Sequence, residues 1–143
     1  MDLYFSDLSG LYIGVKIMNE RKLIEKAKEA MEHSYSPYSK FKVGAAIFCE
    51  SNKVYTGCNI ENSSYGATNC AERTAIFKAI SEGERNFLKI AVVSSANEEI
   101  FPCGICRQVL FEFMENGTFI TENSNGEILT YNIKELLPNS FKF

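Results

Sequence analysis

The sequence has no excess of basic residues, no long apolar run and only one histidine. Its 15 Lys and Arg against 18 Asp and Glu give a net charge of −3, so it lacks the basic footprint that binds nucleic-acid phosphates. No apolar run approaches the ~20 residues that a membrane-spanning helix requires. His33, the one histidine, is expected to end a helix rather than to bind a metal. These absences favour a small, neutral substrate and argue against nucleic-acid and membrane partners.

The cysteines and the N-terminus indicate where the protein works. The five cysteines are an odd number, and three of them have metal-ligand spacing. We therefore expect no disulfide framework and a reducing, cytoplasmic setting. Asp2 and Asp7 stand where a secretory signal would be basic, so we expect no such signal. Residues 1–17 show no reliable period and are interpreted as an N-terminal extension of unknown role, with 18–143 as one domain.

Hydrophobic periodicity predicts an α/β domain with a mixed sheet. An apolar stripe predicts a helix from about 18 to 31, with Asn19 as its cap. Asn125-Gly126 lies between two short apolar runs, which indicates a hairpin. Strands are predicted over 42–49, 54–58, 88–93, 118–122 and 128–131, and further helices over 70–82, 103–115 and 133–137. The order α-β-β-α-β-α-β-β-α contains no repeats and is typical of one α/β domain.

The most informative pattern is Cys70-Ala71-Glu72, followed later by Pro102-Cys103-Gly104-Ile105-Cys106. Three thiolates leave one position of a four-coordinate zinc open, which is typical of catalytic rather than structural zinc. The spacing of Cys103 and Cys106 places both sulfurs on one face of a helix, and the positive helix ends favour the thiolate form. A Cys or His ligand with Glu two residues later, and Pro before a Cys pair, is the signature of zinc nucleobase deaminases.

Two charged residues beside the first cysteine are candidates for supporting roles. Glu72 would carry a proton from the metal-bound water to the substrate; alternatively, its carboxylate only favours a helix N-terminus. Three thiolates on a divalent zinc leave a formal charge near −1, which opposes the activation of bound water. Arg73 is the candidate donor that offsets this charge, although it could be a solvated helix arginine.

The other cysteines leave alternatives open. Cys49 ends a predicted strand and is interpreted as a core thiol, and Cys58 as a packing residue that could still be a fourth zinc ligand. Cys103 and Cys106 could also form a thiol redox pair, but Cys70 and Glu72 would then have no role.

With these residues identified, the chain resembles the small, homotetrameric, three-cysteine type of cytidine deaminase over about residues 18–141. Five motifs in the same order carry the resemblance: SPYSKFKVGAA at 36–46, GCNIENSSY at 57–65, CAERTA at 70–75, PCGICRQ at 102–108 and ELLPNSF at 135–141. The resemblance implies a three-layer α/β/α fold with a five-stranded mixed sheet. It also implies a homotetramer that acts in pyrimidine salvage.

The resemblance further assigns expected roles to individual residues. It implies one Zn²⁺ per chain held by Cys70, Cys103 and Cys106, with Glu72 shuttling protons while zinc-bound hydroxide attacks carbon 4 of the pyrimidine. It implies hydrolytic deamination of cytidine and 2′-deoxycytidine to uridine and 2′-deoxyuridine. The residues implied to contact the nucleoside or to lie near it are Phe41, Asn59, Glu61, Tyr65, the backbone of Ala71, and Phe141, and Arg73 is implied to donate to the ligand sulfurs.

Four other functions remain open at this point. The nearest is a deaminase of the same fold that acts on a nucleoside antibiotic such as blasticidin S, but the Cys70–Arg73 string with Asn59 and Glu61 is more similar to the pyrimidine nucleoside enzymes. A nucleic-acid editing deaminase is disfavoured because the chain is acidic. A structural zinc module and a thiol redox protein are the two non-deaminase alternatives.

Overall fold

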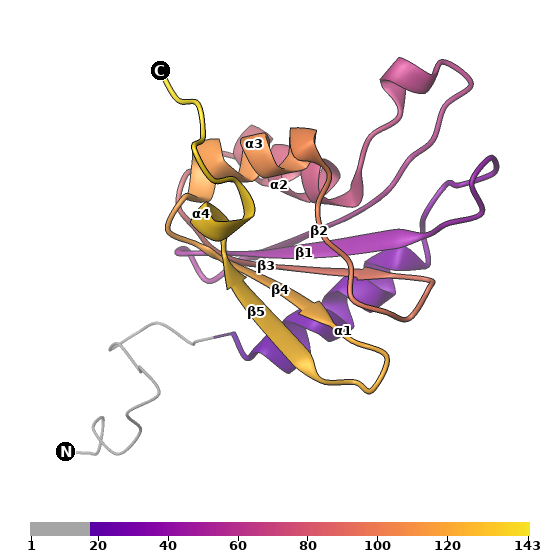
Figure 1. Ribbon diagram of the computed structural model, residues 1–143, viewed down its shortest axis with the longest axis horizontal. Coiled ribbons are helices and arrows are strands. Elements are labelled where there is room, and N and C mark those ends of the chain that lie inside the picture. The colour runs from indigo at the N-terminus through magenta and orange to yellow at the C-terminus, as the bar shows by residue number, and fades with distance from the viewer. Residues whose placement is uncertain (1–17) are drawn as a thin grey trace.

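The sheet lies between two layers of helices, and the computed structural model describes residues 18–143 (Figure 1). The strands are β1 (Val43–Cys49), β2 (Val54–Cys58), β3 (Phe87–Ser94), β4 (Thr118–Glu122) and β5 (Ile128–Asn132). The helices are α1 (Glu20–Met31), the 3₁₀ turn η1 (Tyr65–Ala67), α2 (Ala71–Ser81), α3 (Gly104–Met114) and α4 (Ile133–Leu136). The predicted N-terminal extension, residues 1–17, lies outside the described residues.

The strand order β2-β1-β3-β4-β5 makes the sheet mixed. β3 and β4 run parallel, whereas the other neighbouring pairs run antiparallel. The connection between the parallel strands contains α3, as a parallel crossover usually does. The predicted five-stranded mixed α/β fold is therefore confirmed, with strand and helix ends that differ by one or two residues from the sequence prediction.

One face of the sheet is covered by α1 (Figure 1). Asn19 caps this helix as predicted, because its side-chain oxygen accepts a bond from the Arg21 backbone nitrogen at 2.7 Å. The apolar stripe Leu23, Ile24 and Ala27 is fully buried against the sheet. These contacts account for the stability of a helix whose outer face is charged.

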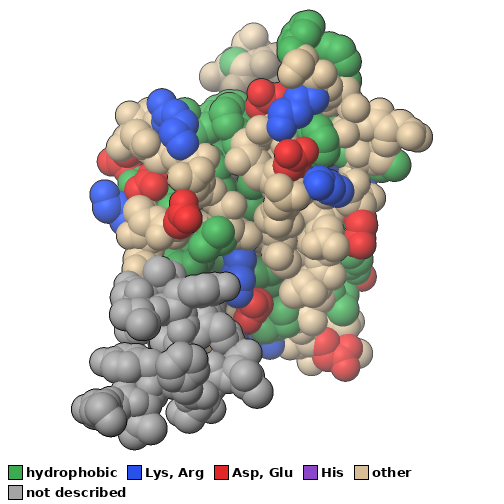
Figure 2. All heavy atoms as spheres, turned by 90° about the vertical axis from the view of Figure 1, so that its left-hand side faces the viewer, with side chains coloured by type: hydrophobic (Ala, Val, Ile, Leu, Met, Phe, Trp, Pro, Cys, Tyr) green, Lys and Arg blue, Asp and Glu red, His purple; other side chains and the backbone are tan. Residues whose placement is uncertain are grey.

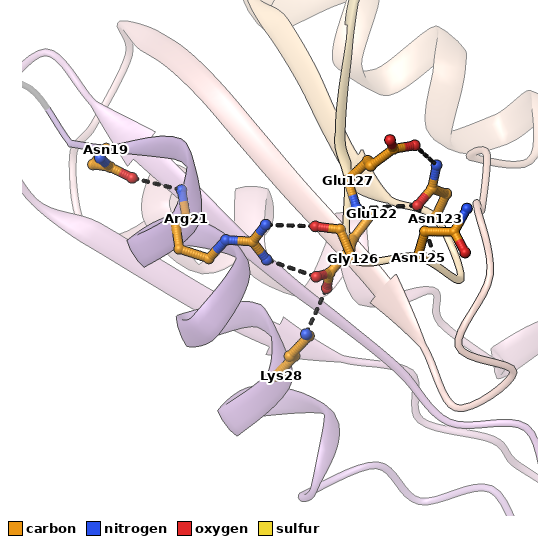
Figure 3. Close-up of polar contacts among 8 residues, drawn as sticks. All are labelled: Asn19, Arg21, Lys28, Glu122, Asn123, Asn125, Gly126 and Glu127. Atoms are coloured by element: carbon orange, nitrogen blue, oxygen red, sulfur yellow. Dashed lines mark hydrogen bonds and ion pairs between the residues drawn. The ribbon is translucent and has the colours of Figure 1, made fainter.

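A polar network clamps the same helix to the β4–β5 hairpin (Figure 3). Glu122 accepts from Arg21 Nη1 at 2.6 Å and pairs with Lys28 Nζ at 2.5 Å. Arg21 also donates from Nη2 to the carbonyl of Gly126 in the hairpin turn, at 2.6 Å. Gly126 has a φ of 78°, which glycine adopts without strain.

The opposite face carries the larger core and is covered by α2, α3 and α4 (Figure 1). α2 lies very close to β2 at Gly57, where an added Cβ would come within 2.5 Å of the Ala75 nitrogen and 2.6 Å of the Ala71 oxygen. Because no larger side chain fits there without movement, Gly57 sets how closely the start of α2 approaches the sheet. Among the described residues, no helix is long and apolar enough to cross a membrane.

Candidate metal centre and active site

Three cysteine sulfurs meet where the N-termini of α2 and α3 converge. Cys70 and Cys103 are the N-caps of these helices, and Cys106 lies in the first turn of α3. The three Sγ atoms lie within 4.8 Å of one another, and those of Cys70 and Cys103 are 3.8 Å apart. A tetrahedral zinc with bonds of ~2.3 Å separates two sulfurs by about 3.8 Å. The three residues therefore fit one zinc ion.

The electrostatics of the sulfurs favour a cation. A hydrogen bond from the Cys106 thiol lowers the pKa of Cys70 to about 5; burial opposes this change and Arg73 adds to it. The same bond, together with burial, raises the pKa of Cys106. The two thiols therefore share one proton readily, and binding of a divalent cation would release it.

Arg73 lies against the first of these sulfurs. Its Nη2 donates to Cys70 Sγ at 3.3 Å, one helical turn after the ligand. Its Nε is buried and has no hydrogen-bond partner among the described residues. Burial alone would lower the pKa of Arg73, but hydrogen bonds to the Cys70 and Cys106 sulfurs outweigh that effect and raise it. The guanidinium therefore stays charged beside the thiolates.

Glu72 lies in the first turn of α2 and is only 4% exposed. Burial, the largest cause, raises the pKa of Glu72 to about 7; its own backbone N–H opposes the shift, and the charge of Cys70 adds to it. A carboxyl group with a pKa near neutrality can both accept and donate a proton at physiological pH. The local arrangement thus places a carboxyl group that titrates near neutral pH next to the three-sulfur centre.

Asn59 and Glu61 occupy the strand end and loop that follow β2. Asn59 Oδ1 accepts from the Val43 nitrogen at 2.8 Å, and its Nδ2 donates to the Phe41 carbonyl at 2.8 Å. Glu61 Oε1 accepts from the backbone nitrogens of Tyr38 and Ser39, at 2.9 and 3.2 Å. These bonds hold both side chains, yet an amide hydrogen of Asn59 and Oε2 of Glu61 are not used by them.

A short backbone bridge joins this segment to the metal centre. Ile60 and Asn69 exchange both N–H···O bonds, each at 2.9 Å, so Asn59–Glu61 runs antiparallel beside the residue before Cys70. The Asn69 amide in turn donates to Thr74 Oγ1 at 3.1 Å. Two groups of residues that are separate in the sequence therefore form one continuous site.

The remaining residues of the sequence-predicted site range from fully buried to largely exposed. Ala71 is fully buried at the start of α2, where a backbone N–H has no acceptor within the helix. Phe41 is 39% exposed, beside Asn59. Tyr65 and Phe141 are 78% and 63% exposed, on the η1 loop that projects from the body and on the C-terminal segment (Figure 1). Among the described residues, no hydrogen bond or ring contact joins these last two to the sulfurs or to Glu72.

Several supporting residues were missed by the sequence analysis. Thr74 Oγ1 donates to the Cys70 carbonyl at 3.1 Å, a bond that its i, i+4 spacing from the ligand could have suggested. The backbone nitrogens that hold Glu61 carry no signal in the sequence. Arg107 donates to the Pro102 and Leu136 carbonyls, which no spacing rule predicts because Leu136 is distant in the chain.

The other two cysteines and the histidine stay apart from this centre. Cys49 is fully buried and its pKa is raised to about 12, mainly by burial, which agrees with the predicted core thiol. Within the described residues, the metal-ligand cluster contains Cys70, Cys103 and Cys106 but neither Cys58 nor His33. A four-ligand structural shell from Cys58 or His33 is therefore not formed.

The surface over β5 and its neighbours shows no basic stripe among its described residues. Figure 2 shows Lys and Arg side chains interspersed with Asp and Glu on this face. This distribution agrees with the acidic net charge.

Comparison with known proteins identifies the family. Residues 18–121 match the model of the cytidine and deoxycytidylate deaminase zinc-binding region. The cytidine deaminase of Sporosarcina psychrophila is 50% identical over 127 residues, which cover 87% of this chain and 92% of that protein. The crystal structure of cytidine deaminase from Burkholderia pseudomallei superposes with a TM-score of 0.82 at 46% identity, over 87% of this chain and 100% of that one. The blasticidin-S deaminase of Bacillus cereus is more distant, with 30% identity over 125 residues that cover 82% of this chain and 88% of that protein. The chain therefore belongs to the zinc-binding cytidine and deoxycytidylate deaminase family.

Proposed function

We infer that the protein is a zinc-dependent hydrolase that converts cytidine and 2′-deoxycytidine to uridine and 2′-deoxyuridine. In this reaction water adds at carbon 4 of the pyrimidine, the bond from carbon 4 to the amino nitrogen breaks, and ammonia leaves. One observation carries the inference: three sulfurs with the separation of a zinc shell lie beside the buried carboxyl group of Glu72. Two of the three cysteines are the N-cap residues of helices, and a three-sulfur shell leaves a position open for water.

The roles within the site follow from its charges. Cys70, Cys103 and Cys106 would hold a zinc ion, whose Lewis acidity would make water nucleophilic near pH 7. Glu72 takes one proton from the attacking water and delivers it to the ring nitrogen; it then takes the second proton from the new hydroxyl group on carbon 4 and delivers it to the leaving amine. Arg73 offsets the third thiolate charge through its bond to Cys70.

We propose that the nucleoside lies between Glu72 and the Asn59–Glu61 segment. The carboxylate of Glu61 and the amide hydrogen of Asn59 that is not donated to the Phe41 carbonyl suit the ribose hydroxyls, since a carboxylate accepts and an amide donates. The N–H of Ala71, which has no acceptor within α2, would donate to the pyrimidine carbonyl. Phe41 supplies an apolar surface for the base.

We also propose that residues 18–143 form the catalytic domain of a cytoplasmic homotetramer in pyrimidine salvage. Support for self-association comes from large apolar side chains that a monomer leaves exposed: Tyr65 at 78%, Phe141 at 63% and Ile105 at 62%. Such residues are enriched at interfaces. Tyr65 and Phe141 would then line the site of a neighbouring subunit rather than their own.

The test is the ultraviolet absorbance change as zinc-loaded protein acts on cytidine, with Glu72→Gln run beside it. We expect conversion to uridine by the wild type and a loss of about 10²–10⁴-fold in kcat for the variant, with zinc retained. The matched control is Glu82→Gln, an exposed charge at the other end of α2, which should keep full activity.

Three results would contradict the proposal. Equal activity of Glu72→Gln and wild type would remove the proton carrier from the mechanism. Turnover of blasticidin S but not of cytidine would point to the antibiotic as substrate. No turnover of either substrate by protein with one zinc per chain would favour a structural zinc.

A further inference from the structure

Arg107 is the first residue after the ligand Cys106, and its side chain folds back over the start of its own helix. Its Nε donates to the Pro102 carbonyl at 2.8 Å, and its Nη1 donates to the Leu136 carbonyl at 2.8 Å. Both acceptors are neutral carbonyl oxygens, so neither bond is an ion pair with a carboxylate. The planar guanidinium fork is suited to holding two acceptors in fixed relative positions.

Arg107 also holds the turn that contains the ligand Cys103. The backbone nitrogen of Arg107 donates to the Cys103 carbonyl at 2.9 Å, while its Nε binds the carbonyl just before that residue. Two consecutive carbonyls, those of Pro102 and Cys103, therefore accept bonds from one residue. Cys103 itself is exposed, so packing does little to fix its sulfur.

The Leu136 carbonyl, which accepts the second side-chain bond of Arg107, lies on a buried part of the fold. Leu136 is 8% exposed and ends α4, where the last carbonyls have no partner within the helix. Ile133, at the other end of α4, is 1% exposed and belongs to the same core as Ala71 and Ala75 of α2. The bond from Arg107 thus ties an exposed turn to a helix that is packed into the core.

We propose that Arg107 is a positioning residue for the metal centre: by bridging Pro102 to Leu136, it holds Cys103 and Cys106 at the separation that zinc requires. The inference rests on the proposed zinc-dependent function, which it deepens. Through this bond, the C-terminal helix α4 supports the turn that contains Cys103, more than thirty residues before Leu136 in the chain. Loss of the bridge lets the exposed Cys103 move away from the other two sulfurs.

The experiment measures how fast a chromogenic chelator removes zinc from the purified, zinc-loaded full chain. Replacement of groups that orient metal ligands typically weakens metal binding 10–100-fold, so we expect Arg107→Ala to release zinc at least about 10-fold faster than wild type. Arg107→Lys keeps the charge but reaches one carbonyl at a time, so its release should be intermediate. In excess zinc, kcat should recover while KM for cytidine changes little.

Two matched controls separate positioning from general stability. Gln108→Ala changes the next residue, whose side chain binds the Phe141 carbonyl at 2.9 Å and not the ligand turn. Glu122→Gln loosens α1 on the opposite face of the sheet. Both should release zinc at the wild-type rate, even where thermal unfolding shifts.

A wild-type rate of zinc release from folded Arg107→Ala would overturn the inference. Should that variant not fold, Arg107→Lys carries the test, and a wild-type rate for it has the same meaning. Equal acceleration in Glu122→Gln would also overturn it, because general destabilisation would then explain the effect. Failure of the wild type to deaminate cytidine rejects the proposed function but leaves the comparison of release rates readable.

Discussion

Replacement of Glu122 by glutamine tests how α1 is held to the β4–β5 hairpin. The carboxylate is 9% exposed and receives Arg21 Nη1 at 2.6 Å and Lys28 Nζ at 2.5 Å (Figure 3). The two cations are less buried, with side chains 42% and 46% exposed. Glutamine keeps the shape and one acceptor oxygen but removes the charge, so the change isolates the electrostatic part of the clamp.

The magnitude follows from this mixed burial. A hydrogen bond to a charged group contributes about 1.5–3 kcal/mol, whereas an exposed ion pair contributes about 0.2–1 kcal/mol. Because both cations reach water, the free energy that each interaction contributes lies near the lower of these two ranges. Glutamine also retains part of one hydrogen bond. We expect the free energy of unfolding to fall by about 1–2 kcal/mol, which corresponds to roughly 3–8 °C in Tm for a chain of this size.

The contribution of Glu122 to stability depends on pH in a definite direction. Burial alone would raise the pKa of Glu122, but hydrogen bonds from Lys28 and Arg21 outweigh it and hold the pKa below its usual value. A carboxyl group with a lowered folded pKa stabilises the protein above its unfolded pKa, about 4.3. That contribution is lost as the pH falls through the folded pKa. The difference between wild type and variant should therefore be full at pH 7 and shrink below about pH 4.

The assay is thermal and urea unfolding at fixed protein concentration, because self-association would make Tm concentration-dependent. Glu127→Gln is the matched control: it removes the same charge from the same hairpin, where Glu127 is exposed and, within residues 18–143, bonded only to Asn123. It should change Tm by less than about 2 °C. Equal effects of the two substitutions, or a Glu122 effect that is the same at pH 7 and pH 3.5, would refute the reasoning.

Two further predictions concern the site. Gly57→Ala should lower the free energy of unfolding by about 1–3 kcal/mol and lower kcat as well, because the added methyl group pushes against α2 beside Ala71 and Ala75. Gly66→Ala is the control, since its added Cβ has nothing within 4 Å. A Gly57→Ala variant that is fully active and stable would contradict the packing. Cytidine 5′-monophosphate should be turned over far more slowly than cytidine, since the Glu61 carboxylate repels a phosphate; comparable kcat/KM for the two substrates would reject this assignment.

Most of the fold could be predicted because its signals are local. The stripe of Leu23, Ile24 and Ala27 and the cap at Asn19 identify α1, since a helix must bury one face and satisfy its first N–H groups. Gly83, with a φ of 100°, ends α2 where predicted. The turn η1 was not predicted, because three residues in a polar loop give no period to detect.

The metal ligands and the Arg73 donor were predicted from the sequence, but most of the other bonds that hold the site were not. The spacing of Cys103 and Cys106, with Pro102 before them, indicates ligands at a helix start. The hydrogen bonds that join Asn59 to Val43 and Arg107 to Leu136 were not predictable, because these residues lie far apart in the sequence. The precise role of Cys103 also differed: it caps α3 instead of lying within its first turn.

The sequence by itself therefore determined the metal-ligand types, the carboxyl group beside them and the order of helices and strands, because capping, periodicity and ligand spacing act over a few residues. Only the tertiary structure decided that the starts of α2 and α3 converge to bring Cys70 Sγ within 3.8 Å of Cys103 Sγ. It also decided that Glu72 is 4% exposed, with its pKa raised to about 7. Convergence and burial depend on how the sheet brings distant segments together, and no local pattern specifies that arrangement.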